Sequence, residues 1–224
     1  MQRPLTHRLG LIAGLLLAFA ACSKRPGSSG EQEGAAAAAA SSGSQVPPPV
    51  SEPSPPLPEG LQGVDAAELL RRAQAALKEA SQKTEGPRGV LINVWASWCG
   101  SCRAEMPMLQ SVEQRYAERG IRLLFVSVDS LDQAPAALAF VEEMRLPKPG
   151  LIVTERLGLF KPALSPQWRG TLPATFLFDA TGRLRYFWGA QVFEEELTPI
   201  LDGFLSGEDI DGAANFKVQL SAPR

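Results

Sequence analysis

The sequence predicts an α/β domain with a central mixed β-sheet and helices on both of its faces. Residues 90–96 and 121–128 are apolar on both sides, as buried parallel strands are, and a helical pattern separates them. Strand, helix and strand in this order form a right-handed crossover unit. Two further strand-like runs, 174–179 and 183–189, are separated by three residues, which indicates an antiparallel hairpin.

The first 21 residues have the three parts of a secretory signal: basic residues, an apolar run and small residues. The run, Leu9–Ala21, is too short to span a bilayer. It ends in "FAAC", which resembles the lipobox of bacterial lipoproteins, although Phe19 stands where Leu is usual. The resemblance implies lipid on Cys22 and stable membrane anchoring by several acyl chains. The alternative is an ordinary secretory signal that leaves this cysteine unmodified.

Cleavage of the signal changes the composition of the chain. It removes Arg3, Arg8 and the single histidine, His7, so 20 of the 22 basic residues remain against 24 acidic ones. An excess of acidic residues argues against nucleic-acid binding. Once the lipidated cysteine is set aside, Cys99 and Cys102 are the remaining thiols, and a framework of several disulfides is excluded. Disulfides persist in exported proteins, so the oxidation state of this pair is a functional variable.

Residues 22–60 are rich in Ala, Ser, Gly and Pro and lack apolar periodicity, so we expect a disordered tether, although its six consecutive alanines could form a short helix. The folded domain is expected over residues 61–206, with a tail at 207–224. Its first element is a helix that begins near Asp65, a candidate N-cap, because apolar residues recur at helical spacing over 66–80.

The other elements follow from alternating apolar runs and turn signals, with Asp132 as a candidate helix cap. In chain order they are the strand 90–96, a helix from Cys99 to about Glu118, the strand 121–128, a helix over 132–146, a strand at 150–153, a less regular segment at 154–170, the hairpin and a closing helix at 193–205.

The stretch "WASWCGSC", Trp95–Cys102, is the part of the sequence that indicates chemistry. At positions i and i+3 of a helix, Cys99 and Cys102 are neighbours, close enough for a disulfide across one turn. Cys99 would lie at the helix N-terminus, where backbone N–H groups and the helix dipole favour a thiolate. Because the thiolate attacks in disulfide exchange, Cys99 is the predicted nucleophile and Cys102 resolves the mixed disulfide.

Two cysteines at this spacing also occur in metal sites. A closed zinc site needs a second pair of cysteines or histidines, which the cleaved chain lacks, so we predict no metal and no other cofactor. A two-thiolate copper(I) site stays open. The alternatives to a redox enzyme are therefore a non-enzymatic copper(I) carrier and an adaptor whose thiols are idle.

The segment "NVWASWCGSCRAEMP" resembles the active-site segment of the thioredoxin-like family, most of all its membrane-anchored TlpA and ResA branch, and the similarity extends over about 86–206. The resemblance implies a thioredoxin-like fold with a catalytic CxxC between a central strand and a helix. Ser101 departs from the Pro of many relatives, at a position known in this family to tune the redox potential. The tether also runs almost directly into a helix, where many TlpA-like proteins begin with a β-hairpin.

Two polar residues near the cysteines carry further expectations. Asn93 replaces the buried aspartate of thioredoxins proper, and we expect a hydrogen-bonded core amide that relays no protons. Glu105 lies on the apolar stripe of the active-site helix, where burial raises the pKa of a carboxyl and suits it to exchange protons with the cysteines. The ResA-like resemblance also places a functional glutamate there. The alternative is an edge glutamate that turns to solvent and pairs with an arginine. Pro107 matches a structural proline of the family.

The run "GTLPATFLFD" supplies the other half of the expected site. A proline that opens a strand is ordinarily trans, but the resemblance implies a cis Pro173 that faces the CxxC. The backbone of Leu172 would then pair with an extended substrate segment. Of the two tryptophans, Trp95 is expected in the core and Trp98 is expected to be exposed as a substrate contact.

The resemblance thus implies a lipid-anchored thiol-disulfide oxidoreductase of the bacterial cell envelope, with its domain in the periplasm or extracytoplasmic space. Its expected partners are protein thiols and disulfides and a membrane electron donor that keeps it reduced. We expect it to act as a reductant, with apocytochrome or copper-site cysteines as candidate substrates, and this direction rests on family analogy.

Overall fold

The computed structural model describes residues 56–81, 85–86 and 88–210. The expected signal, the lipidation site Cys22, most of the tether and residues 211–224 of the tail lie outside these residues. No helix in the described part of the chain combines the length and the apolar character that crossing a bilayer requires.

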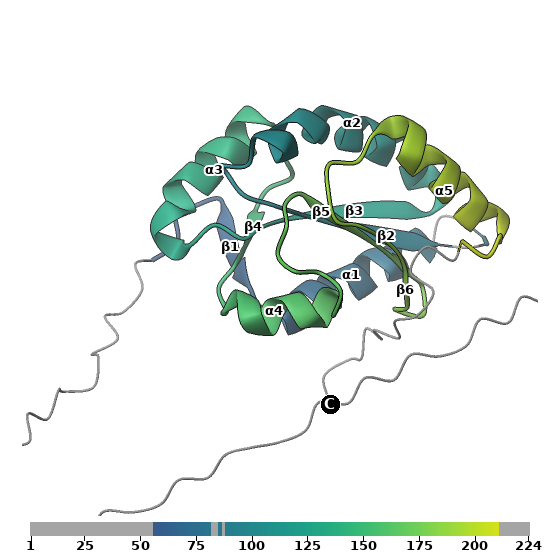
Figure 1. The fold of residues 1–224 in the computed structure, drawn as a ribbon, viewed down its shortest axis with the longest axis horizontal. Coiled ribbons are helices and arrows are strands. Elements are labelled where there is room, and N and C mark those ends of the chain that lie inside the picture. The colour runs from purple at the N-terminus through teal and green to yellow at the C-terminus, as the bar shows by residue number, and fades with distance from the viewer. Residues whose placement is uncertain (1–55, 82–84, 87, 211–224) are drawn as a thin grey trace, which may run out of the picture. The chain divides into compact units, whose positions relative to one another are not determined.

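Six strands form one mixed sheet in the order β1-β4-β3-β2-β5-β6, as Figure 1 shows. The first four strands pair in parallel, and β5 pairs antiparallel with both β2 and β6. The predicted mixed sheet is therefore confirmed, as is the hairpin. The strands are β1 (Leu61–Val64), β2 (Gly89–Trp95), β3 (Ile121–Ser127), β4 (Gly150–Val153), β5 (Ala174–Asp179) and β6 (Leu184–Trp188).

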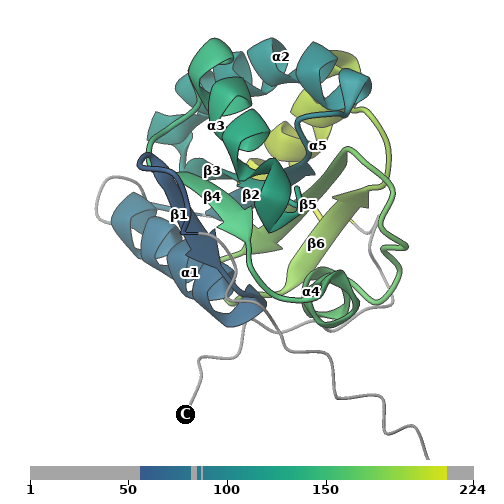
Figure 2. The ribbon, with the colours of Figure 1, turned by 90° about the vertical axis from the view of Figure 1, so that its left-hand side faces the viewer.

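Helices cover both faces of the sheet, with α2, α3 and α5 on one face and α1 and α4 on the other (Figures 1 and 2). Each face has its own apolar core. The helices are α1 (Ala66–Ser81), α2 (Gly100–Tyr116), α3 (Ala134–Glu143), α4 (Leu157–Leu164) and α5 (Glu194–Ser206), with short 3₁₀ turns η1 (Ala117–Arg119) and η2 (Leu131–Gln133).

The central strand β2 is buried at all seven positions. Its side chains alternate between the faces, so Leu91 and Trp95 belong to the core under α2, and Ile92 and Val94 belong to the opposite core. Asn93 shares the α2 face with the first pair by the same alternation. The strand therefore presents one amide toward the helix that carries the cysteines.

Two element predictions are wrong because they depend on contacts far along the chain. The domain does not begin with a helix at Asp65: the four-residue strand β1 precedes it and pairs with β4. Asp65 does cap α1, since its Oδ1 accepts a hydrogen bond from the Glu68 N–H at 2.8 Å. The segment 154–170, expected to be irregular, contains the helix α4, which buries Phe160 against the sheet.

The prediction that Asp132 caps the helix after β3 is also wrong. Asp132 lies inside η2, and α3 begins only at Ala134. The turn is instead held by Gln133, whose Oε1 accepts a hydrogen bond from the Ser130 hydroxyl at 2.9 Å. A 3₁₀ turn of three residues has no apolar periodicity that could have shown it.

Candidate active site

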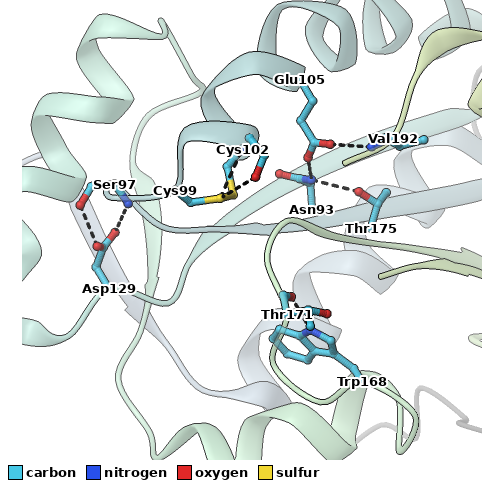
Figure 3. The surroundings of a disulfide bond; sticks show 11 residues. Asn93, Ser97, Cys99, Cys102, Glu105, Asp129, Trp168, Thr171, Thr175 and Val192 are labelled. Atoms are coloured by element: carbon cyan, nitrogen blue, oxygen red, sulfur yellow. Dashed lines mark hydrogen bonds between the residues drawn. A yellow bond between two sulfur atoms is a disulfide. The ribbon is translucent and has the colours of Figure 1, made fainter. Parts of the chain in front are cut away.

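The two cysteines lie where β2 leads into α2. They form a disulfide with their Cα atoms 5.3 Å apart, as Figure 3 shows. Cys99 is the N-cap of α2, and its Sγ accepts a hydrogen bond from the Cys102 N–H at 3.2 Å. The predictions of a cross-link and of Cys99 at the helix N-terminus are confirmed. The hydroxyl of Ser101 lies 3.5 Å from the same sulfur.

The two cysteines differ in what can reach them. Cys99 keeps 7% of its surface exposed, whereas Cys102 has none. Of the two residues, Cys99 is therefore the one with surface open to an external thiol or disulfide. This asymmetry agrees with the roles that the spacing predicts.

Glu105 is buried one turn along α2 from Cys102, at 1% exposure. Its carboxyl oxygens accept hydrogen bonds from the Asn93 side-chain amide at 2.8 Å and from the Val192 N–H at 2.9 Å (Figure 3). Burial raises the pKa of Glu105 to about 7, and the two donated hydrogen bonds oppose this rise. The alternative of a solvent-facing glutamate paired with an arginine is therefore wrong.

Asn93 is a hydrogen-bonded core amide, as predicted. Its Nδ2 donates to the Glu105 carboxyl and also to the Thr175 hydroxyl at 3.0 Å, across the β2–β5 pair in which the two residues are opposite each other. Sequence reasoning missed Thr175 and Val192. A polar residue inside the apolar run "ATFLFD" was a signal for the first, but a backbone N–H leaves no signal in a sequence.

A second buried carboxylate, Asp129, holds the loop that precedes Cys99. It accepts hydrogen bonds from the Ser97 N–H at 2.9 Å and the Ser97 hydroxyl at 2.8 Å (Figure 3), and from the Ser127 hydroxyl at 2.6 Å. The loop that precedes Cys99, here called the reactive loop, is thus hydrogen-bonded to the residues at the end of β3. Sequence reasoning missed this residue, although an acid directly after a buried strand was its signal.

The two tryptophans of the motif lie as predicted. Trp95 is buried and stacks on Phe140 with ring centroids 4.3 Å apart. Trp98 is 63% exposed and directly precedes Cys99 in the chain. Its role as a substrate contact stays a prediction.

The segment before β5 reaches the same edge of the sheet. The Leu172–Pro173 peptide bond is cis, which confirms the prediction. The pairing of β5 with β2 ends at Ala174, so Leu172 and Pro173 lie beyond the paired residues. The indole N–H of Trp168 donates to the Thr171 carbonyl at 2.8 Å and so holds this segment (Figure 3). Sequence reasoning missed that contact.

Side chains that could bind a metal do not cluster in the described part of the chain. No group of three or more His, Cys, Asp or Glu side chains comes together there. A metal that used the cysteines would need Cys99 and Cys102 reduced, with both thiolates as its ligands.

Comparison with known proteins places these residues in a family context. A model of the AhpC/TSA family matches residues 66–187. The thiol-disulfide oxidoreductase ResA of Oceanobacillus iheyensis is 27% identical over 128 residues, which cover 57% of this chain and 56% of that protein. The thiol:disulfide interchange protein DsbE homolog of Paracoccus denitrificans is 31% identical over 161 residues, which cover 68% of this chain and 82% of that protein.

The chain spans 56% of the first ResA relative and 62% of the next two. Among solved structures, a thiol:disulfide interchange protein of the thioredoxin family from Chlorobium tepidum TLS has a TM-score of 0.46 and 21% identity. That alignment covers 59% of this chain and 84% of the other.

Proposed function

From the premise that this chain belongs to the thioredoxin-like AhpC/TSA family, we propose that it is a thiol-disulfide oxidoreductase whose redox couple is Cys99 and Cys102. The observation that carries the proposal is the disulfide across the first turn of α2, with one sulfur at the helix N-terminus, on the cysteine that keeps some exposed surface. Such a sulfur is activated as a thiolate and can be reached by a substrate.

In the reducing direction, the Cys99 thiolate attacks one sulfur of a substrate disulfide. The substrate S–S bond breaks, the first substrate thiolate leaves, and a mixed disulfide with Cys99 remains. Cys102 then attacks Cys99, forms the intramolecular disulfide and releases the second substrate thiolate. Two electrons pass to the substrate, and two protons complete its thiols.

Glu105 fits the role of a proton acceptor in the second step, because Cys102 must lose its proton before it attacks. A carboxyl with a pKa of about 7 is charged in part of the molecules at neutral pH, and so can both take up and release a proton. Asn93 and the Val192 N–H hold the carboxyl in place on the buried face of α2, which also carries Cys102. In this proposal they are positioning groups and do not transfer protons.

Substrate binding is assigned to the exposed Trp98 and to the backbone of Leu172 beside Pro173, where an extended segment can pair. The substrates are protein thiols and disulfides, and the direction is reduction, with a membrane reductase as the electron source. The similarity to the thiol-disulfide oxidoreductase ResA and to the thiol:disulfide interchange protein DsbE homolog supports substrates that carry thiols or disulfides.

The proposal includes export and anchoring. Residues 1–21 would be the signal, Cys22 the lipidated residue, 22–60 the tether, 61–206 the domain and 207–224 the tail. The lipobox-like "FAAC" supports a lipid anchor in the cell envelope, with the domain in the periplasm or extracytoplasmic space.

Trapping of substrates tests the proposed function. In cells that express the full chain, Cys102→Ala should leave Cys99 joined to its substrates as mixed disulfides, which mass spectrometry identifies after non-reducing gels. Cys99→Ala is the matched control and should trap none. A well-expressed, folded Cys102→Ala protein that captures no partner would contradict the proposal, and copper(I) bound to the reduced wild type without any exchange would identify a carrier instead.

A further inference from the structure

The connections of two neighbouring strands, β3 and β4, go to opposite faces of the sheet. The chain leaves the carboxyl end of β3 toward α3 on one face, and that of β4 toward α4 on the other (Figure 1). In open α/β sheets, ligands bind in the crevice that such a divergence opens. A crevice of about 300 Å³ lies here, formed by residues 128–131 and 153–157. Its size is at the lower end for ligand sites.

The carboxylates of this crevice are already engaged, and its open surface is mainly apolar, although Ser130, Thr154 and Arg156 also line it. Asp129 accepts three hydrogen bonds from serine groups, and Glu155 accepts one from a backbone N–H of α1 at 2.6 Å. The side chains of Val128, Leu131 and Leu157 line the crevice and are incompletely buried. It therefore suits an aliphatic group better than a cation.

Large apolar side chains of the described residues are exposed beyond the ends of three strands. Each follows the carboxyl end of β2, β4 or β6, and these three strands run in one direction. The large exposed apolar side chains are Trp98, Leu157, Leu159 and Phe193, of which Leu157 lines the crevice and Leu159 does not.

Asp129 connects the crevice with the reactive loop. It lines the crevice, and its carboxylate also accepts both the backbone N–H and the hydroxyl of Ser97, two residues before Cys99. The crevice therefore borders the loop that carries the reactive sulfur. A polypeptide whose sulfur is joined to Cys99 lies next to this apolar surface.

We propose that this crevice is a substrate subsite that receives an aliphatic side chain from a residue near the reacting cysteine of an extended polypeptide. The inference rests on the proposed function, because only disulfide exchange at Cys99 brings such a polypeptide to this edge. Unfolded proteins expose apolar residues beside their cysteines, whereas small disulfides have none. The substrate class is then unfolded or partly folded protein.

The experiment uses two synthetic peptides that each carry one cysteine as a mixed disulfide with glutathione. In one peptide Leu and Val flank the cysteine, and in the other Ser does. The Cys99 thiolate of the Cys102→Ala protein attacks the peptide sulfur, the peptide–glutathione bond breaks as the Cys99–peptide bond forms, and glutathione leaves as a thiolate. The rate constant is measured from the mass of the protein–peptide adduct.

In that background, Leu157→Ser combined with Leu131→Ser should slow the reaction of the Leu/Val peptide about tenfold, since two aliphatic contacts are lost. The Ser peptide and glutathione disulfide should react within about twofold of the parent rate. Leu159→Ser is the matched control, because this leucine is exposed in the same helix but does not line the crevice. It should leave all three rates unchanged.

Equal slowing of both peptides, no slowing of either, or the same selective loss in Leu159→Ser would overturn the subsite. Thermal unfolding checks that the double variant is folded. If it is not, Leu157→Ser alone serves, because this side chain is 40% exposed and its loss leaves little unfilled space. A parent protein that forms no adduct even with glutathione disulfide would overturn the proposed function instead.

Discussion

Two buried carboxyls flank the disulfide, and they differ in what their surroundings give them. Asp129, at the end of β3, accepts three hydrogen bonds, two of them from the reactive loop itself. Glu105, under α2, accepts two and has a pKa of about 7. The first is built to hold the loop, and the second is able to change its charge. The difference teaches that burial alone does not decide what a carboxyl does.

The largest expected effect is a pH dependence of stability to which Glu105 contributes most, with a smaller contribution of the same sign from Glu113, whose pKa burial also raises. The pKa of Glu105 is raised from 4.5 to about 7 on folding, so between these values the folded state binds more protons than the unfolded state. Its contribution to stability is present below pH 4.5 and is lost as the pH rises through 7. The free energy of unfolding should fall by about 3 kcal/mol over this window.

Urea unfolding at several pH values measures this contribution. Glu105→Gln should remove most of the slope between pH 4.5 and 7. A slope that survives undiminished in Glu105→Gln would mean that another group carries it.

The next effect is on the rate at which the mixed disulfide is resolved, and it concerns Glu105. Glu105→Gln keeps the size and the hydrogen-bonding oxygen but cannot take up the proton of Cys102, so resolution of the mixed disulfide at pH 7 should slow about a hundredfold. Stopped-flow measurement of that step with a preformed mixed disulfide checks it. The initial attack by Cys99 should be nearly unaffected, and an equal loss in both steps would contradict the role in proton transfer.

Removal of the other carboxyl should act on stability instead. Asp129→Ala leaves three donors without their acceptor: the N–H and the hydroxyl of Ser97, and the hydroxyl of Ser127. It should lower the free energy of unfolding by about 2 kcal/mol. Urea unfolding measures the loss. Asp132→Ala, an exposed aspartate three residues away, is the control and should change it by less than about 0.5 kcal/mol. Similar losses in the two variants would contradict the holding role.

The smallest expected effect concerns the sulfur between the two carboxyls. In the reduced protein the Ser101 hydroxyl can donate to the Cys99 thiolate, so Ser101→Ala should raise the pKa of Cys99. Loss of this stabilised thiolate disfavours the reduced form and should lower the reduction potential by about 15 mV. Equilibration with glutathione measures it, with Ser111→Ala as the exposed control on the same helix. A rise in potential would reverse the assigned direction of the hydrogen bond.

The sequence predicts one carboxyl of this pair and misses the other, and the reason is physical. Glu105 shares a helical face with Cys102, so spacing alone places it near the sulfur. Asp129 becomes important only because β3 lies beside β2 in the sheet, a pairing between residues far apart in sequence. The strand β1 and the hydrogen bond from the Val192 N–H are not predicted, because they too depend on contacts between residues far apart in sequence. The cis bond at Pro173 is predicted only through the family resemblance.

The unequal exposure of the two sulfurs has a kinetic consequence for the proposed enzyme. Because Cys102 is wholly enclosed, the electron donor and the electron acceptor must both act through the single sulfur of Cys99. The two partners cannot be bound productively at once, so electrons pass in alternate half-reactions. Steady-state rates measured at several concentrations of each partner should give parallel double-reciprocal lines, as a ping-pong mechanism does.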